Sequence, residues 1–144
     1  MSKSVARSRK TASNAPAEYT GGIIIKSPRE LELMRQAGRI VAATLAVLRD
    51  AVRPGMATRE LDIIASREIR RRGGKAVFKG YRGFPASVCV SINNEIVHGI
   101  PGERTIREGD LVKLDLGASV QGYIGDAAIT VGVGEISDEA RSLM

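Results

Sequence analysis

Two aspartates, Asp115 and Asp126, stand in the segment Leu111–Val133 at positions where an acidic side chain is costly. The segment, LVKLDLGASVQGYIGDAAITVGV, is typical of two strands joined by a tight reversal at Gln121–Gly122. Because side chains alternate between the faces of a strand, both aspartates are expected on one face. A four-residue loop would place them directly opposite each other, whereas a two-residue loop would pair Asp115 with Ala128 and make Asp126 the diagonal neighbour.

Two carboxylates this close repel each other unless a proton or a cation lies between them. Oxygen ligands suit divalent cations such as Mg, Mn, Fe and Co, and bridging carboxylates allow two ions to share one site. The alternative is a pair of acids at hairpin ends that are solvated or bound to arginine. The two residues by themselves leave the metal site and the structural acid pair both open.

His98 and Cys89 are the only histidine and the only cysteine of the chain. A lone histidine at a strand end is more often structural than catalytic, although the Gly-Ile-Pro-Gly turn after His98 fixes its backbone direction and favours a chemical role. Cys89 is typical of a small buried apolar residue. No third orienting group accompanies the two, so the sequence does not support a catalytic triad.

Two helices are expected before these residues. Ser27 as N-cap, Pro28 at the first helical position and Glu30 closing a capping box predict the start of the first helix, which ends at residues 53–55. Gly38 in its middle is expected to mark close contact with another element. Its predicted buried face consists of Leu31, Met34, Val41, Leu45, Leu48 and Val52.

The second helix is expected to begin at Thr58 and to end in Arg70–Arg72, followed by two glycines. Cations at the negative end of the helix dipole explain these arginines as capping residues; a phosphate-binding patch is the alternative. Its predicted apolar face consists of Leu61, Ile64, Ala65 and Ile69.

Strands and turns are expected from Lys75 onward. The glycine-rich loop 78–85, FKGYRGFP, holds three of the five aromatic residues and would form an apolar wall for a substrate side chain beside a metal site. Residues 86–92 are predicted to form a strand with Cys89 and its neighbouring serines on one face, and residues 95–98 to form a short return strand.

Ser137 is expected to cap one more helix near the end of the sequence. The sequence stops within that helix, and no further metal ligand follows the pair Asp115 and Asp126. Both the fold and the metal site are therefore expected to be incomplete at this end.

Composition limits the possible classes of protein. A chain of 144 residues, 43% of them hydrophobic and only 3% aromatic, is expected to form one domain with an aliphatic core. It has no apolar run of roughly 18 residues and no apolar block of a secretory signal, and one cysteine suits a reducing compartment. We expect a cytoplasmic protein that does not enter a membrane, with a disordered basic tail over residues 1–22 and a domain over residues 23–144.

The net charge of +6 is unevenly distributed. Residues 23–82 carry fourteen basic and six acidic side chains, whereas residues 83–144 carry four basic and nine acidic ones, so the acids gather near the expected metal site. A basic half and a basic tail can bind RNA or the ribosome, although a solvated surface and a tail without a partner are the commoner cases.

Three segments together resemble the amino-terminal half of type I methionine aminopeptidases: IKSPRELELMRQAGRIVAATL, GYRGFP and SVCVSINNEIVHGIPGERTIREGDLVKLDLGASVQGYIGDAAITVGVG. The spacing of Asp115 and Asp126, the HGIP segment at His98 and the order of the elements carry the resemblance over residues 23–144. It implies an α/β pita-bread fold, in which two pseudo-symmetric halves enclose a dinuclear metal centre. The half present here would pack two helices on an antiparallel sheet.

The resemblance also assigns a metal site by position. It implies that Asp115 ligates one divalent ion and that Asp126 bridges two, with Co, Mn, Fe or Zn as the metals. The family's other ligands, one histidine and two glutamates, come from the second half, so this chain alone is expected to be inactive. Gly117 stands where part of the family has a threonine.

Substrate-binding residues follow from the same resemblance. His98 matches the histidine that hydrogen-bonds the substrate near the scissile peptide and helps to stabilise the tetrahedral intermediate. Tyr81, Phe84 and Cys89 match positions that line the pocket for the methionine side chain. Arg82 stands where many relatives have a second histidine.

The implied function is removal of the initiator methionine from nascent polypeptide N-termini by metal-activated hydroxide, in a family whose members are usually monomeric. One competing hypothesis is a non-catalytic pita-bread relative that binds the ribosome, RNA or protein; the presence of His98, Asp115 and Asp126 argues against it. Another is a peptidase of the same fold that cleaves before proline or acts on creatine-like substrates; the short HGIP segment and the first helix argue against that one.

Overall fold

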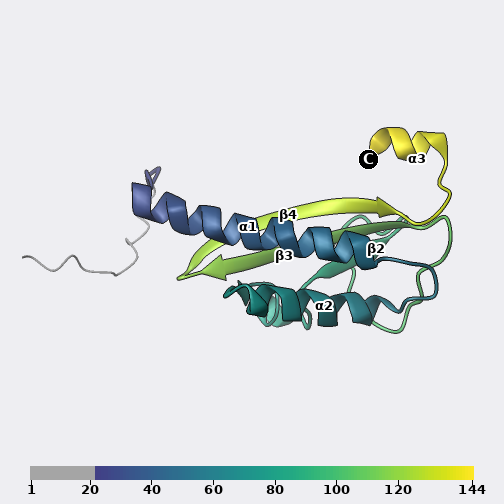
Figure 1. Ribbon diagram of the computed structural model, residues 1–144, viewed down its shortest axis with the longest axis horizontal. Coiled ribbons are helices and arrows are strands. Elements are labelled where there is room, and N and C mark those ends of the chain that lie inside the picture. Colours follow the sequence, from purple (N-terminus) through teal and green to yellow (C-terminus); the bar gives the residue numbers. More distant parts are fainter. Residues whose placement is uncertain (1–21) are drawn as a thin grey trace, which may run out of the picture.

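The structure is a computed structural model that describes residues 22–144, and it has two layers: a four-stranded antiparallel sheet and two helices on one of its faces (Figure 1). The tail predicted over residues 1–22 lies outside the described residues, apart from Gly22. Along the chain the elements are α1 (Pro28–Ala51), α2 (Thr58–Arg71), β1 (Lys75–Ala76), a 3-10 turn (Tyr81–Gly83), β2 (Cys89–Ile92), β3 (Leu111–Val120), β4 (Tyr123–Gly132) and α3 (Asp138–Leu143).

The central strand of the sheet is β3. It pairs antiparallel with β1 and β2 along one edge and with the full length of β4 along the other. Within the described residues β4 has no second neighbour, so its outer edge is unpaired. Gln121 and Gly122, with φ of 50° and 88°, form the two-residue turn whose left-handed backbone suits the twist of a hairpin.

The start of α1 agrees with the sequence. The side chain of Glu30 accepts the Ser27 backbone N–H at 2.7 Å, and the Ser27 hydroxyl accepts the Glu30 N–H at 3.3 Å. The predicted buried face is wrong at its first two members, because Leu31 and Met34 are 43% and 37% exposed. The residues that pack on the sheet form a stripe displaced around the helix: Leu33, Ala37, Ile40, Val41, Thr44, Leu45 and Leu48.

A close approach of two backbones explains this displacement. A Cβ on Gly125 of β4 would lie 2.6 Å from the Gly38 nitrogen and 2.8 Å from the Ala37 carbonyl carbon, so only glycine fits there. The helix therefore rests on β4 through its small residues, and larger side chains in the first turn point elsewhere. The predicted close contact at Gly38 is confirmed.

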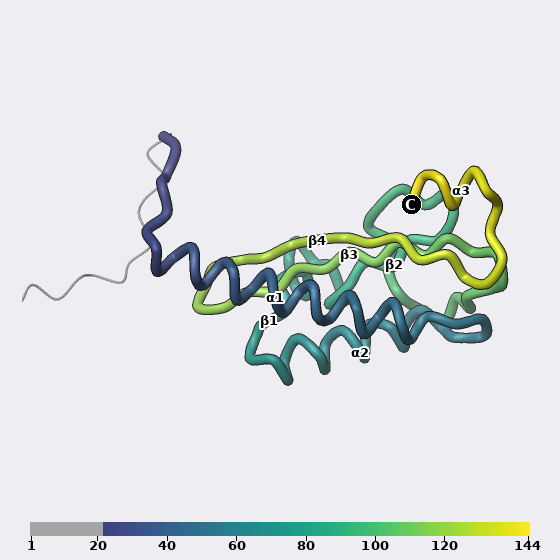
Figure 2. The backbone as a smooth tube through the Cα atoms, turned by 45° about the horizontal axis from the view of Figure 1, so that its top comes forward, coloured from purple at the N-terminus to yellow at the C-terminus, as the bar shows by residue number. Residues whose placement is uncertain are grey.

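The core lies between the helices and the sheet (Figure 2). Side chains of α1 and α2 meet the helix-facing residues of β3, all fully buried: Val112, Leu114, Leu116 and Ala118. The predicted start of α2 at Thr58 is confirmed. Its final arginines do more than cap the helix, because Arg71 and Arg72 lie 2.7 Å and 3.5 Å from the buried carboxylate of Glu68.

Two predicted strands differ from the structure. The strand predicted over residues 86–92 is shorter, since β2 begins at Cys89. The return strand predicted over residues 95–98 does not form. Asn93 and His98 have φ of 56° and 59°, which interrupts extended backbone. The Glu95 N–H donates to the Ile92 carbonyl at 3.1 Å, as in a turn, and the one bond back to the middle of β2 lies just after the segment, from the Val90 N–H to the Gly99 carbonyl at 2.9 Å.

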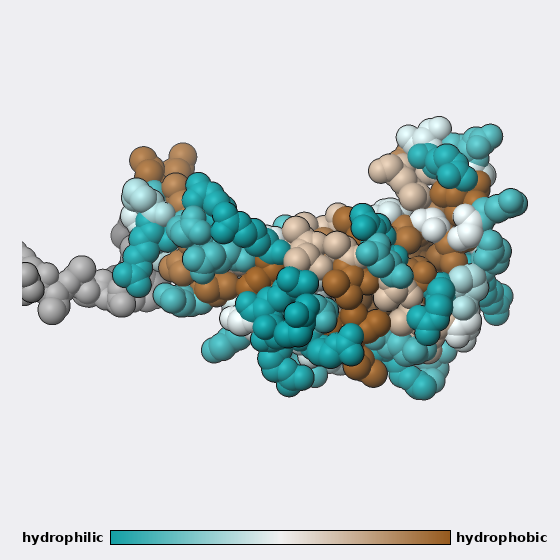
Figure 3. Space-filling view, viewed as in Figure 1, coloured by the Kyte–Doolittle hydropathy of each residue, from teal (hydrophilic) through white to brown (hydrophobic). Residues whose placement is uncertain are grey.

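The two ends of the described chain project from the body. Ile23 and Ile25 form no strand and are 98% and 90% exposed, which leaves an apolar projection before α1 (Figure 3). At the other end α3 forms as predicted, with the Ser137 hydroxyl accepting the Ala140 N–H at 3.1 Å, but none of its residues is buried. None of the helices in residues 22–144 is long and apolar enough to cross a membrane.

Candidate metal and substrate site

The two aspartates lie on the face of the sheet that the helices leave uncovered, which we call the open face. Asp115 pairs with Ala128 and Gly117 pairs with Asp126, so the two acids are diagonal neighbours on β3 and β4. This is the register expected for a two-residue loop. The side chain of Asp126 lies close to β3: a Cβ on Gly117 would be 3.3 Å from the Asp126 Oδ2 atom.

Neither aspartate has an ion-pair or hydrogen-bond partner among residues 22–144. Partial burial raises the pKa of Asp115, and the negative charge of Asp126 raises it further, while His98 lowers it. His98 offsets only part of the cost of ionising Asp115, and no lysine or arginine of the described chain forms an ion pair with it. This observation removes the alternative of an acid pair neutralised by arginine within the described chain.

Cys89 of β2 lies directly opposite Asp115 on β3 and shares its side of the sheet. It is buried, and its pKa is raised to about 11 by burial and by the charges of Asp115 and Asp126. The thiol is therefore neutral and poorly nucleophilic at physiological pH. It agrees with the predicted small buried side chain and brings an apolar surface to the two acids.

His98 is exposed and stands at the rim of a hollow of about 560 Å³ beside Asp115. Its backbone is pinned to β2 by the next residue: the Gly99 N–H donates to the Ser91 hydroxyl at 3.0 Å, and a Cβ on Gly99 would meet the Val90 carbonyl oxygen. The residues that line the hollow are Arg49, Ser91, Ile96, Val97, His98, Lys113, Asp115, Ala128, Ile129, Thr130 and Met144. The hollow contains Asp115 and His98 but not Asp126.

The aromatic loop lies at the Asp126 end of the site. Phe78 and Phe84 contact edge to face, with ring centroids 6.4 Å apart. A Cβ on Gly117 would lie 3.2 Å from Phe78 and 2.5 Å from Val77, so the Phe78 ring lies beside the two acids. The loop composition suggested such a wall, but the specific contact of Phe78 was not apparent from the sequence.

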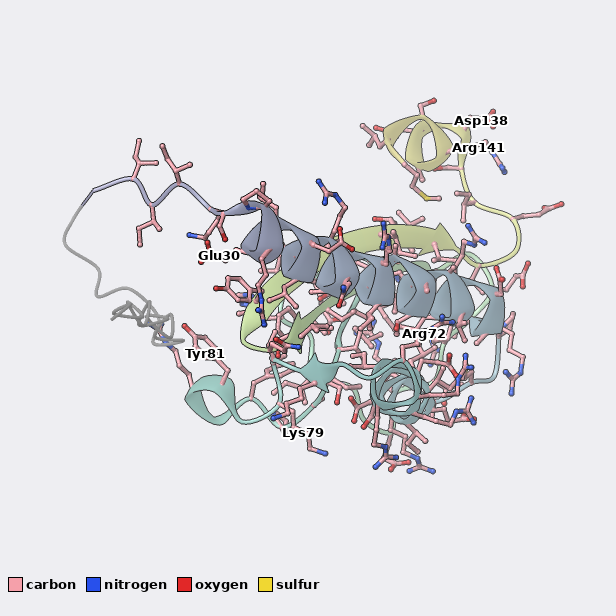
Figure 4. The ribbon with its side chains drawn as sticks, turned by 60° about the vertical axis from the view of Figure 1, so that its left-hand side comes forward. Glu30, Arg72, Lys79, Tyr81, Asp138 and Arg141 are labelled. Atoms are coloured by element: carbon pink, nitrogen blue, oxygen red, sulfur yellow. The ribbon has the colours of Figure 1, made fainter. Side chains whose placement is uncertain are left out.

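Tyr81 stands apart from this wall. It is 63% exposed in the 3-10 turn, where the Arg82 guanidinium carbon lies 5.4 Å from its ring centroid, and its side chain extends away from the sheet (Figure 4). The structure brings His98, Asp115, Asp126 and Cys89 to one face of the sheet. Tyr81, Phe84 and Cys89 do not line the hollow that holds His98.

The two carboxylates fit a divalent cation but do not complete its coordination. Asp115 and Asp126 offer up to four hard oxygen donors on a surface where no lysine or arginine of the described chain forms an ion pair with them, which suits Mn or Co. Within residues 22–144, however, no three histidine, cysteine or acidic side chains converge on one point. Any further donors have to come from outside the described part of the chain.

A family model for metallopeptidases matches residues 32–144, which is most of the chain. The chain belongs to metallopeptidase family M24. Among curated relatives, methionine aminopeptidase 1 of Bacillus subtilis is 52% identical over 122 residues, and methionine aminopeptidase of Clostridium perfringens is 48% identical over 122 residues. Each alignment covers 85% of this chain and 49% of the relative.

Solved structures of M24 proteins have the same fold. The crystal structure of methionine aminopeptidase from Thermotoga maritima matches with a TM-score of 0.82 at 39% identity, over 85% of this chain and 49% of that one. The Xaa-Pro dipeptidase of Bacillus anthracis matches with a TM-score of 0.70 at 27% identity, over 82% of this chain and 32% of that one. The chain is thus similar to the amino-terminal half of pita-bread enzymes and spans about half the length of the curated relatives it matches.

Proposed function

We propose that this chain is the metal-binding amino-terminal half of a methionine aminopeptidase. The single observation that carries the proposal is the diagonal pair Asp115 and Asp126 on the open face, without a basic partner in residues 22–144 and beside His98. The M24 membership and relatives about 50% identical that are named methionine aminopeptidase support it. The substrate would be a nascent polypeptide whose first residue is methionine, and we place the protein in the cytoplasm for that reason.

In this proposal Asp115 and Asp126 would both hold the divalent ions, two of them, with Co, Mn, Fe or Zn as the metals. When bound, such ions supply a hydroxide near neutral pH and polarise the carbonyl of the substrate. A bound cation would relieve the mutual repulsion between the two carboxylates, and this relief favours its binding. Cys89 stays protonated and packs beside the carboxylates without adding a charge.

His98 would hold the substrate peptide. Its ring stands at the rim of the hollow that contains Asp115, and Gly99 fixes the direction of the backbone that carries it. A hydrogen bond from an imidazole N–H to the substrate oxygen would strengthen as negative charge develops there. The apolar surface around Phe84 and Cys89, completed by Phe78, would accept the methionine side chain.

Relatives with other specificities share the fold, including the Xaa-Pro dipeptidase. Identity favours the methionine aminopeptidases, at 39% for the Thermotoga maritima structure against 27% for the dipeptidase. Since residues 22–144 supply only two of the proposed metal ligands, we expect no peptidase activity from this chain in isolation and full activity only from a protein that contains both halves.

Calorimetric titration of Mn into the metal-free chain tests the site. We expect Asp115→Asn and Asp126→Asn each to weaken Mn binding by at least about tenfold, because each removes a charged oxygen ligand. Asp138→Asn on the exposed helix α3 is the matched control and should leave the affinity unchanged. Equal affinities in all four proteins would contradict a metal site at the two acids.

The role of His98 needs an activity readout. In a protein that contains both halves, His98→Ala should lower kcat for a peptide that begins with methionine, while the Mn affinity stays the same, because the imidazole contacts substrate and not metal. A parallel loss of Mn affinity would instead place His98 among the metal ligands. Unchanged kcat would remove His98 from the substrate site.

A further inference from the structure

A second cavity lies away from the open face, between the end of α2, β1 and the residues before β2. Its volume is about 360 Å³, and it shares no lining residue with the hollow at His98. Its polar lining consists of three basic side chains and two hydroxyls: Arg70, Lys75, Lys79, Ser66 and Ser87. This composition has no part in the proposed peptidase site.

The three basic residues of the cavity have no acidic partner within residues 22–144. The neighbouring arginines differ, because Arg67, Arg71 and Arg72 all lie within 3.8 Å of the buried Glu68 carboxylate. Glu68 is thus committed to those three, and the positive charge of Arg70, Lys75 and Lys79 remains without an ion pair in the described chain. Lys79 reaches outward on the side of the sheet where α2 lies (Figure 4).

Ser87 supplies an independent observation. It is fully buried, it lines the cavity, and its hydroxyl has no hydrogen-bond partner in the described residues. Its backbone N–H donates to Asp62 Oδ1 at 2.6 Å, which fixes the residue at the wall while the Asp62 carboxylate stays outside the lining. A buried hydroxyl without a partner is costly, and a ligand with acceptor oxygens would remove that cost.

We propose that this cavity binds one phosphate group. Three cations and two hydroxyl donors on one concave surface suit an anion rich in acceptor oxygens, and charge-assisted hydrogen bonds are the strong ones. A volume of about 360 Å³ admits a phosphate with a small attached group and excludes a folded segment. The phosphate belongs either to a free small molecule or to an RNA backbone; a phosphate monoester offers three terminal oxygens and a backbone diester offers two, and all of them accept hydrogen bonds.

The test uses the full chain without metal, in a chelator-treated chloride buffer, because phosphate also binds divalent ions. Inorganic phosphate is titrated calorimetrically, and the backbone amides of Gly74 and Ser87 are followed by NMR. The paired variant Lys75→Gln/Lys79→Gln removes two cavity charges. Its matched control, Arg35→Gln/Arg39→Gln, removes the same charge from α1, where both arginines already pair with Glu32.

We expect saturable binding of one phosphate per chain, with shifts at Gly74 and Ser87. The cavity variant should weaken it by at least about tenfold, since each lost ammonium removes a charge-assisted contact. Ser87→Ala should weaken it with the fold intact by circular dichroism, and Asp115→Asn should leave it unchanged, which separates this site from the proposed peptidase site. Competition by a short single-stranded RNA identifies the backbone as the source, and no competition identifies a free phosphate compound.

Three results would overturn the proposal. The first is that inorganic phosphate does not bind to the chain, even if RNA does. The control variant could lose as much affinity as the cavity variant, which would indicate net charge alone. The amide shifts could fall elsewhere in the chain.

Discussion

Asp115, Asp126 and Cys89 form one electrostatic group although they come from three strands. Burial and the charges of Asp115 and Asp126 raise the pKa of Cys89 to about 11, and burial together with the charge of Asp126 raises the pKa of Asp115 above its usual value. A cation bound at the two acids would lower the pKa of both Cys89 and Asp115. The surroundings of these three side chains therefore favour the binding of a positive charge.

The thiol of Cys89 gives a direct readout of this group. In the metal-free chain Asp115→Asn should lower the pKa of Cys89 and speed its alkylation by iodoacetamide at pH 8, because the thiolate is the reactive form and loses a repelling neighbour. The measurement is the alkylation rate against pH. Asp50→Asn on α1 should change nothing, and an unchanged rate in Asp115→Asn would show that the two groups are not coupled.

Side-chain alternation was enough to place the two acids on one face, because sidedness in a strand depends only on odd or even spacing. The sequence left two registers open, and the structure has the two-residue turn. The contact between Phe78 and Gly117 could not be found in the same way. It joins a loop to a strand about forty residues later, and no local pattern records such a distance.

At the scale of elements, two glycines with different surroundings control how α1 meets the sheet. Gly125→Ala should destabilise the fold by about 1–3 kcal/mol, because its Cβ would meet the backbone of α1. Gly38→Ala should stabilise it by roughly 0.5–1 kcal/mol, because a Cβ there meets nothing within 4 Å and alanine favours helix. Urea unfolding of the two variants measures both effects, and the same sign for both would contradict the packing.

The N-terminus of α1 is tied to the hairpin through Glu30. The pKa of Glu30 is lowered to about 2, first by the backbone N–H of Ser27 and then by its hydroxyl, with a further contribution from the Tyr123 hydroxyl, which donates to Glu30 at 2.8 Å. A lowered pKa means that ionised Glu30 stabilises the fold above about pH 4.5 and that this contribution is lost as the pH falls toward 2.

The pH dependence of the midpoint of urea unfolding tests this role. Glu30→Gln should lower stability at pH 7 and flatten the decline between pH 4.5 and 2, because the group that titrates there is gone. Glu139→Gln on α3 should keep the decline. A decline of equal size in Glu30→Gln and the unaltered chain would assign it to other acids.

Elements set by local chemistry were predictable, and elements set by distant partners were not. The capping box at Ser27, the turn at Gln121–Gly122 and the cap at Ser137 each depend on residues within four positions of one another. The two-residue strand β1 exists only because β3 lies beside it. The return strand at residues 95–98 fails because left-handed residues flank it, which the alternating pattern does not reveal.

At the scale of the whole molecule, helices cover only one face of the sheet. The helices bury one face, while the β4 side of the open face, the outer edge of β4 and the projection at Ile23 and Ile25 are exposed in the described chain. The curated relatives are about twice as long as the part of this chain that matches them. In the proposed function these surfaces are the ones that a second half would contact, and the two acids lie among them.

The unpaired edge makes a prediction about association. The isolated chain should form concentration-dependent oligomers, because an edge strand of ten residues offers free N–H and C=O groups to another copy. Ile124→Lys places a charge on that strand and should reduce association in light scattering. Ile63→Lys on α2 changes an equally exposed isoleucine and should have no effect, so equal loss in both variants would rule out the edge as the contact.

The bare edge of β4 also has a consequence during biosynthesis. A ribosome adds roughly 5–20 residues per second, so in a protein of the relatives' length the hairpin would leave the exit tunnel on the order of ten seconds before synthesis ends. Throughout that interval the strand has no neighbour on one side. We therefore expect the nascent hairpin to be open to pairing with other strands until the rest of the protein is made.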